Sequence, residues 1–199
     1  MTGAPKLAPP GAGLPPLEMF LQRHIFFPLF VRSVGYGKAL EYFLEESKLL
    51  RADVEGILVD NRDVPILVPR LPAIEDSSRN WSATMVLEHL IIVGDRIALV
   101  AQSLASGQVP PGKADTAAVK PEGTYNGSNI LEKYDEFVRR YRDIVSPIVE
   151  ARRGTRTVSG AKFDHPWFGP MDEHQWLVLA ALHQRIHRRQ IAEIIKGLK

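Results

Sequence analysis

Residues 176–191 read WLVLAALHQRIHRRQI, and this stretch carries the clearest pattern in the chain. On a helix, which turns by about 100° per residue, His183 and His187 lie on one stripe together with Trp176 and Gln190. The arginines at positions 185 and 189 fall on the opposite face. The pattern predicts an amphipathic helix whose inner face carries two imidazoles.

Three further segments repeat apolar residues every three or four positions, which is the spacing of a helix with one buried face. They span residues 38–58, 82–106 and 129–152, and the last helix spans residues 171–198. No comparable run alternates in steps of two, so we expect little strand. Helices with matched apolar stripes predict an all-α fold, a four-helix bundle.

The N-terminal part of the chain has a different composition. Residues 1–16 are rich in proline and glycine, and we expect them to form a flexible tail. Residues 17–32 predict an additional N-terminal helix, kinked or split at Pro28. We therefore expect a single helical-bundle domain over residues 17–199, with its core bundle at about 38–199.

Composition excludes several kinds of site. Of the 199 residues, 45% are hydrophobic and 24% are charged, as in an ordinary globular domain. Cysteine is absent, which excludes disulfides, thiolate-bound zinc, iron–sulfur clusters and a cysteine nucleophile. Lysine and arginine number 25 against 23 acidic residues, a net charge of +2, so we expect no nucleic-acid partner. No apolar run approaches the ~20 residues of a membrane span, and no secretory signal is visible, so we expect no membrane partner and a cytoplasmic location.

The histidines are the candidate metal ligands. His183 and His187, four residues apart on a helix, can bind one metal ion through their ring nitrogens. His89 lies between Val86 and Val93 on the inner stripe of its own helix and can add a third nitrogen. Three protein ligands leave a coordination position open, as in catalytic metal sites. The alternative is that these are core histidines held by hydrogen bonds, because burying imidazoles without partners is costly.

The histidines belong to a wider set of short motifs. In chain order these are Trp81-Ser82, Glu88-His89-Leu90, His165-Pro166-x-Phe168-Gly169 and His183-x-x-x-His187-Arg188-x-Gln190-Ile191. Taken together over residues 38–199, they resemble the DinB/YfiT-like metalloenzyme family.

The resemblance implies a four-helix bundle that frequently forms homodimers. It also implies a divalent metal ion, nickel or zinc before iron or manganese, held by His89, His183 and His187. Some relatives use a low-molecular-weight thiol, as in bacillithiol transfer or mycothiol-dependent maleylpyruvate isomerisation. No thiol-cofactor signature is visible here, so the metal site carries over and the substrate stays open. The helix at residues 17–32 departs from the minimal family pattern, and its role stays open too.

Two function classes follow from these observations. The first is a metal-dependent hydrolase or thiol-dependent transferase acting on a small molecule, in which the metal lowers the pKa of a bound water or thiol. The second is a non-catalytic, metal-stabilised binding or stress-related protein. An open coordination position and a polar pocket would favour the enzyme, whereas a fourth protein ligand or an apolar seal would favour the alternative.

Several further side chains are candidates for the surroundings of the metal. Gln190 is expected to hydrogen-bond the preceding histidine of its stripe. Arg96, two turns beyond His89, could pair with an anionic substrate or a buried carboxylate. Tyr134 and Tyr141 have core spacing, although one of them could present its hydroxyl to the pocket.

Two proline-containing segments could cover the open coordination position. Residues 107–127 form an unusually long connection, which is either a tolerated crossover or a functional loop. Residues 165–168 precede the last helix, and there His165 could line the mouth of the site or serve a structural turn. Trp176 lies on the same stripe as the histidines of the last helix.

Overall fold

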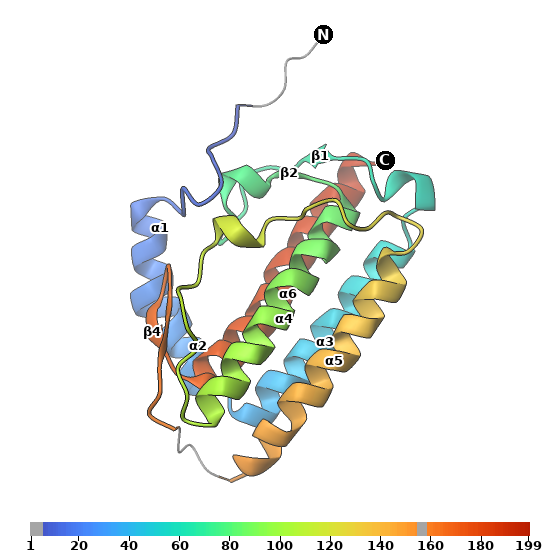
Figure 1. Cartoon of the computed structure of the whole chain (residues 1–199). Coiled ribbons are helices and arrows are strands. Elements are labelled where there is room, and N and C mark those ends of the chain that lie inside the picture. The colour runs from blue at the N-terminus through green and yellow to red at the C-terminus, as the bar shows by residue number, and fades with distance from the viewer. Residues whose placement is uncertain (1–5, 155–158) are drawn as a thin grey trace.

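Four long helices run side by side through the part of the chain that the structure describes, residues 6–154 and 159–199 (Figure 1). In this computed structural model they are α3 (Tyr36–Glu55), α4 (Ala83–Ala105), α5 (Ile130–Ala151) and α6 (Glu173–Gly197). Helix α3 packs against α5 and α6, and α4 packs against the same two helices, which closes the bundle. The predicted all-α four-helix bundle is confirmed, with helix ends within a few residues of those expected.

The connection between α4 and α5 sets the order of the bundle. It climbs from the end of α4 back along the length of the molecule, so that α4 and α5 run in the same direction (Figure 1). A short 3-10 turn, η4 (Ala117–Val119), lies in the middle of this crossover. Two further 3-10 turns, η2 (Val59–Asn61) and η3 (Asp76–Ser78), lie in the connection from α3 to α4.

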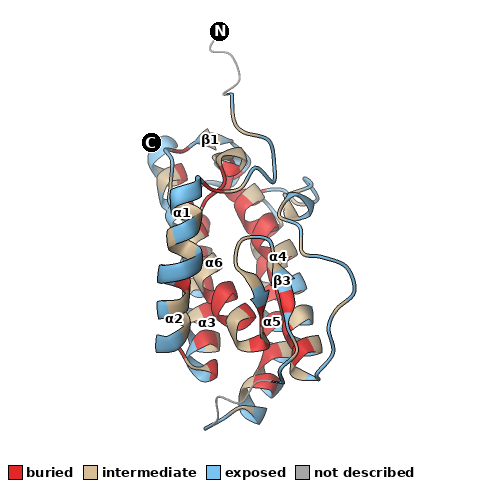
Figure 2. Ribbon diagram, turned by 90° about the vertical axis from the view of Figure 1, so that its left-hand side faces the viewer, coloured by how far each residue is buried: buried red, intermediate tan, exposed pale blue. Residues whose placement is uncertain are grey.

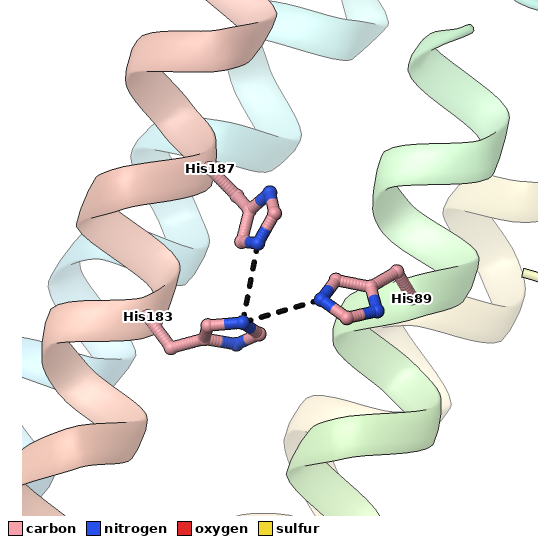
Figure 3. Close-up of side chains that lie close together, drawn as sticks. All are labelled: His89, His183 and His187. Carbon is pink, nitrogen blue, oxygen red and sulfur yellow. Dashed lines mark hydrogen bonds between the residues drawn. The ribbon is translucent and has the colours of Figure 1, made fainter. Parts of the chain in front are cut away.

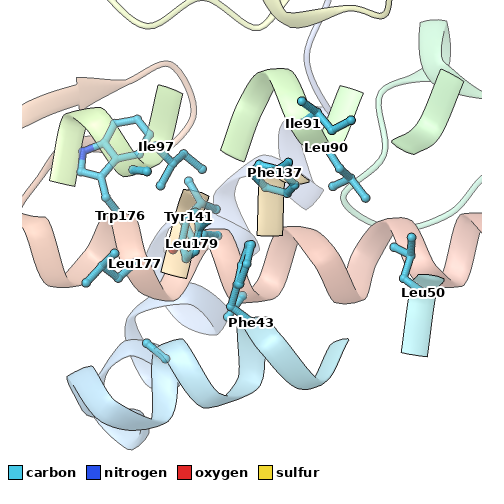
Figure 4. Close-up of a cluster of buried hydrophobic side chains, with 14 of the residues drawn as sticks. Phe43, Leu50, Leu90, Ile91, Ile97, Phe137, Tyr141, Trp176, Leu177 and Leu179 are labelled. Atoms are coloured by element: carbon cyan, nitrogen blue, oxygen red, sulfur yellow. The ribbon is translucent and has the colours of Figure 1, made fainter. Parts of the chain in front are cut away.

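Aromatic side chains fill the centre of the bundle (Figure 4). The Phe43 ring of α3 stacks on the Tyr141 ring of α5, with ring centroids 3.7 Å apart. Phe137 of α5 packs against Gly94 of α4, where a Cβ atom would overlap its ring. Tyr134 is also fully buried, and its hydroxyl donates a hydrogen bond to Gln184 Oε1 over 2.6 Å. Both tyrosines therefore belong to the core.

Two short antiparallel strand pairs precede the helices that carry the histidines. Strand β1 (Ile66–Leu67) pairs with β2 (Asn80–Trp81) ahead of α4, and β3 (Phe163–His165) pairs with β4 (Gly169–Met171) ahead of α6. The sequence pattern did not predict them, because two or three residues are too few to show an alternation. They fix the points at which α4 and α6 begin.

Side-chain caps hold the first turns of both helices. The Ser82 hydroxyl accepts a hydrogen bond from the Met85 N–H over 3.1 Å at the start of α4. At the start of α6, Asp172 and Gln175 form a reciprocal capping box. Because caps satisfy N–H groups that the helix cannot, they fix where each histidine-bearing helix begins.

The additional N-terminal helix is present and lies along the outside of the bundle (Figure 2). It consists of α1 (Pro16–Leu21), a π-helical turn η1 (Gln22–Phe26) and α2 (Phe27–Ser33). The expected irregularity lies just before Pro28: the helix passes through the π-helical turn η1 and continues into α2, and Pro28 lies in the first turn of α2.

Part of the expected N-terminal tail is anchored to the connection that precedes α4. Residues 1–5 lie outside the described ranges. The Ala8 N–H donates to Asp76 Oδ2 over 2.8 Å, and Leu14 is buried. Within the described residues, no helix has both the length and the apolar character needed to cross a membrane.

Candidate metal centre

Three imidazoles from two helices converge inside the bundle (Figure 3). His89 comes from α4, and His183 and His187 come from successive turns of α6. The Nε2 atom of His183 lies 3.2 Å from Nε2 of His89 and 3.1 Å from Nε2 of His187. One ring nitrogen of each residue lies within 4.8 Å of the others, so the group could hold a metal ion. Among the described residues, no carboxylate belongs to this group.

Hydrogen bonds on the far side of two rings fix which nitrogen carries the proton. His89 Nδ1 lies 2.6 Å from the carbonyl oxygen of Val119, which can only accept, so Nδ1 is the donor. His187 Nδ1 lies 2.8 Å from Gln190 Oε1, and the Gln190 amide nitrogen donates to the Ser78 carbonyl over 2.7 Å. The Ser78 bond orients the amide, so His187 Nδ1 is a donor as well. Both Nε2 atoms therefore present lone pairs to the interior.

This proton arrangement leaves the three nitrogens incompletely satisfied. A neutral His183 ring can place at most one proton on Nε2, yet that atom faces two lone pairs. Burial holds the pKa of His89 and of His183 well below the ordinary value, and repulsion from neighbouring imidazoles adds to the effect. Burial also lowers the pKa of His187 to about 4. Three neutral imidazoles with converging lone pairs fit a divalent cation, which accepts electron pairs from all of them at once.

The loop that approaches His89 is fastened to the neighbouring residue of α4. The buried carboxylate of Glu88 accepts hydrogen bonds from the backbone N–H groups of Glu122, Gly123 and Thr124, at 3.2, 3.1 and 2.8 Å. These bonds hold the crossover against α4 just after Val119. The loop can therefore present the Val119 carbonyl to the His89 ring.

Trp81 forms a further wall beside the imidazoles. Its ring centroid lies 5.0 Å from that of His89 and 6.2 Å from that of His187, and the His187 ring is nearly parallel to it. The Lys120 ammonium lies 5.4 Å from the Trp81 ring centroid. Lys120 also donates to Glu75 Oε2 over 2.6 Å, so this cation beside Trp81 is paired with a carboxylate.

The three histidines open onto a cavity of about 710 Å³. Its walls come from the N-terminal helix, the connection before α4, the crossover, the β3–β4 hairpin, and helices α4 and α6. Both segments predicted as covers border it. The crossover contributes Thr116, Val119 and Lys120. The hairpin contributes His165, Trp167 and Phe168.

The structure separates the other candidate residues into two groups. Gln190 bonds His187 as expected, and His165 and Trp176 line the cavity with their ring centroids 5.4 Å apart. Burial lowers the pKa of His165 to about 4. Arg96 is exposed and does not line the cavity, and the two tyrosines lie in the core away from it.

The position of Arg96 has a simple geometric cause. A seven-residue step falls about 20° short of two full turns, and Ile97 takes the interior position at that level of α4. Sequence reasoning also missed Val119, Lys120 and Glu75. Val119 acts through its backbone carbonyl, which has no residue-type signal, and Lys120 and Glu75 meet only because two loops fold together.

Comparison with known proteins supports the fold. No family model and no curated protein matches the chain. One similar solved structure is TT2238, described as a four-helix bundle protein, with 22% identity, a TM-score of 0.53, and coverage of 79% of this chain and 98% of that chain. At this identity the likeness concerns the bundle fold alone, and membership of the DinB/YfiT-like family stays a prediction.

A second structure corrects the prediction about partners. It is the colibactin self-resistance protein ClbS in complex with double-stranded DNA, with 12% identity, a TM-score of 0.42, and coverage of 81% of this chain and 94% of that chain. The expectation that a chain of this kind has no nucleic-acid partner is contradicted by that complex. The near-neutral net charge was too weak a basis for it, because net charge says nothing of local charge distribution.

Proposed function

We propose that this protein is a metal-dependent enzyme, a hydrolase or a thiol-dependent transferase, with one divalent ion held by His89, His183 and His187. The observation that carries the proposal is the convergence of three ring nitrogens, two of which are fixed as lone pairs by hydrogen bonds on the opposite side of the ring. Two histidines packed for structure alone would need only one N–H donor and one lone-pair acceptor where their rings meet.

The surrounding residues give each ligand its orientation. The Val119 carbonyl and the Gln190 amide hold the His89 and His187 rings, and Trp81 limits how far either ring can rotate. Partners of this kind typically raise the basicity of metal-bound imidazole.

The donor set favours zinc or nickel. Imidazole nitrogen suits these metals, whereas magnesium and calcium prefer oxygen ligands, and no carboxylate of the described residues joins the group. A bound ion of this type supplies Lewis acidity, which lowers the pKa of a water or thiol ligand. Since the chain has no cysteine, any thiol in the reaction comes with the substrate.

Access to the site supports catalysis over a purely structural ion. Three protein ligands leave room for a substrate group, and the adjoining cavity is large enough to admit one. The second candidate, a metal-stabilised binding protein without turnover, is favoured by the many apolar side chains that line the same cavity. Turnover in a screen of thiol and hydrolysable substrates distinguishes the two.

The metal assignment is tested with two histidine variants. Protein purified without an affinity tag should contain close to one divalent ion per chain. His183→Ala should lose most of it, because metal affinity falls steeply when one of three ligands is removed. His174→Ala serves as the control, since His174 packs on Tyr36 at the start of α6 and does not line the cavity. Equal metal content in the two variants would overturn the assignment.

A further inference from the structure

Six phenylalanine and tryptophan side chains line the cavity beside the histidines. The N-terminal helix, the β3–β4 hairpin and α6 contribute Phe26, Phe27, Phe30, Trp167, Phe168 and Trp176. Phe27 stacks on Phe168 with ring centroids 4.4 Å apart, which joins the helix to the hairpin. Aromatic walls favour a ligand that has an apolar, flat body.

The size of the cavity points to an organic molecule. Pockets for drug-sized ligands commonly measure ~300–1,000 Å³, and this one is about 710 Å³. A metal ion with small ligands such as water would fill only a minor part of that space.

The N-terminal helix borders this space and joins the hydrophobic core only through Phe27 and its neighbours Phe30 and Val31. Of residues 16–33, only Phe27 is buried. Glu18 also holds the helix, because its carboxylate accepts from Arg70 over 2.5 Å and from the Ala73 N–H over 2.6 Å. Phe26 and Phe30 border the cavity, so a ligand there would cover apolar surface that the fold itself leaves open.

The charged residues of the cavity wall are mainly basic, because Arg185 and Arg189, which were expected on the face of α6 opposite the histidines, border the cavity as well. The wall contains three basic side chains, those of Arg185, Arg189 and Lys120, and one carboxylate, that of Glu75. Glu75 is already paired with Lys120. Arg185 forms one long ion pair, to Glu46 over 4.0 Å, and within the described residues Arg189 forms none. Arg189 and the remaining donors of Arg185 can therefore bind a ligand, and guanidinium is suited to carboxylate and sulfonate groups.

One buried donor of the cavity wall has no partner. Trp176 is only 4% exposed, and among the described residues its Nε1–H finds no acceptor. A buried N–H without a partner costs free energy. Because protein atoms cover this N–H, an acceptor would reach it only after the indole ring turns toward the cavity.

We propose that the cavity binds an aromatic anion, a molecule with a flat apolar body and one carboxylate or sulfonate group for Arg185 and Arg189. Binding depends on the cavity alone. That such molecules are the substrate class of the histidine centre rests on the proposed function.

A pair of dyes tests both parts of this specificity. 1-Anilinonaphthalene-8-sulfonate and N-phenyl-1-naphthylamine share one aromatic body, and only the first is an anion. Fluorescence titration of the full chain in the presence of a chelator should give one saturable site for each dye. The sulfonate should bind about fivefold more tightly, because partly exposed ion pairs contribute about 0.5 kcal/mol each.

Two tryptophan substitutions locate the dye. Val93→Trp fills the cavity from α4, and Thr116→Trp fills it from the irregular crossover, where the helices do not depend on the residue. Each should weaken both dyes at least tenfold. Val109→Trp is the matched control, because Val109 is 59% exposed and lies outside the cavity wall. If both variants bind like the control, the dye lies elsewhere and the proposal is wrong.

A double arginine variant tests the anion preference. Arg185→Gln with Arg189→Gln should reduce the affinity for the sulfonate to that of the neutral dye. Arg139→Gln with Arg142→Gln, exposed on α5, should leave the ratio unchanged. An unchanged ratio in the first double variant would overturn the anionic part of the proposal.

The metal centre and the aromatic-anion site can fail separately. His183→Ala should lose the metal ion and still bind both dyes. Loss of dye binding in Val93→Trp with full metal content would support the cavity site alone. A wild-type protein that binds metal but neither dye would refute the aromatic-anion site and leave the metal centre standing.

Discussion

Replacing Gln190 with leucine removes the group that orients His187. Gln190 is completely buried, and it links the His187 ring to the Ser78 carbonyl through two hydrogen bonds, of 2.8 and 2.7 Å. Leucine fills a similar volume and offers neither bond. The Gln190→Leu variant therefore separates the orienting role of the amide from simple packing.

Two magnitudes follow from these contacts. The variant leaves His187 Nδ1–H and the Ser78 carbonyl without partners in the interior, at about 1–3 kcal/mol each, so we expect a loss of stability of about 2–6 kcal/mol. Loss of a hydrogen bond to a metal-bound histidine commonly reduces metal affinity about 10–100-fold. We expect a loss of zinc affinity in that range.

Gln184 supplies the matched control on the same helix. It is also buried, but its Oε1 accepts from the Tyr134 hydroxyl in the core, and among the described residues no hydrogen bond joins it to the ligand rings. Gln184→Leu should cost about 1–3 kcal/mol, because one hydroxyl loses its partner. Its zinc affinity should remain close to wild type.

The assay is competition with a chromophoric zinc chelator at neutral pH, alongside thermal unfolding of the metal-free proteins. Zinc affinity that is unchanged in Gln190→Leu would refute the assigned orientation of His187. Equal losses of affinity in the two glutamine variants would show that general loosening of α6, and not the His187 bond, accounts for the effect.

Three further predictions concern pH, packing and the crossover. Burial keeps the pKa of His187 at about 4 against an ordinary 6.5, so the unfolded chain binds the proton more tightly than the folded chain. The stability of the metal-free protein should therefore be full above about pH 6.5 and should fall as the pH approaches 4. An unfolding temperature that stays constant over this range would contradict the prediction. Gly94→Ala should destabilise by about 1–3 kcal/mol through overlap with Phe137, whereas Gly37→Ala, which meets no neighbour, should be neutral in the same denaturant titration. Glu88→Ala should raise amide exchange at residues 122–124 and weaken zinc binding, and unchanged exchange would argue against the anchoring role.

The helices and their inner faces could be predicted from sequence because each follows one periodic rule. The repeat of apolar residues through α4 and α6 reports directly which side chains face inward, and His89, His183 and His187 occupy positions of that repeat. The same rule failed for Arg96, where the drift of a straight helix over two turns turned the side chain outward.

The environment of the histidines depends on features that no local pattern contains. The Val119 carbonyl reaches His89 because of the path of a long loop, and any residue type could supply that carbonyl. Lys120 meets Glu75 across 45 positions of sequence. The cavity likewise exists because the N-terminal helix lies across a gap, a tertiary arrangement that its own amphipathic pattern does not specify.

The three amide bonds to Glu88 divide the crossover into two stretches with different freedom to change. Residues 119–124 are tied to α4 beside a ligand, so an insertion there would shift the carbonyl that holds His89. Residues 107–113 are almost all exposed, and added length at such a surface site costs little. New sequence can therefore accumulate in residues 107–113 while the histidine centre keeps its geometry. Relatives of this chain can differ in the length and composition of that stretch without having to rebuild the histidine centre.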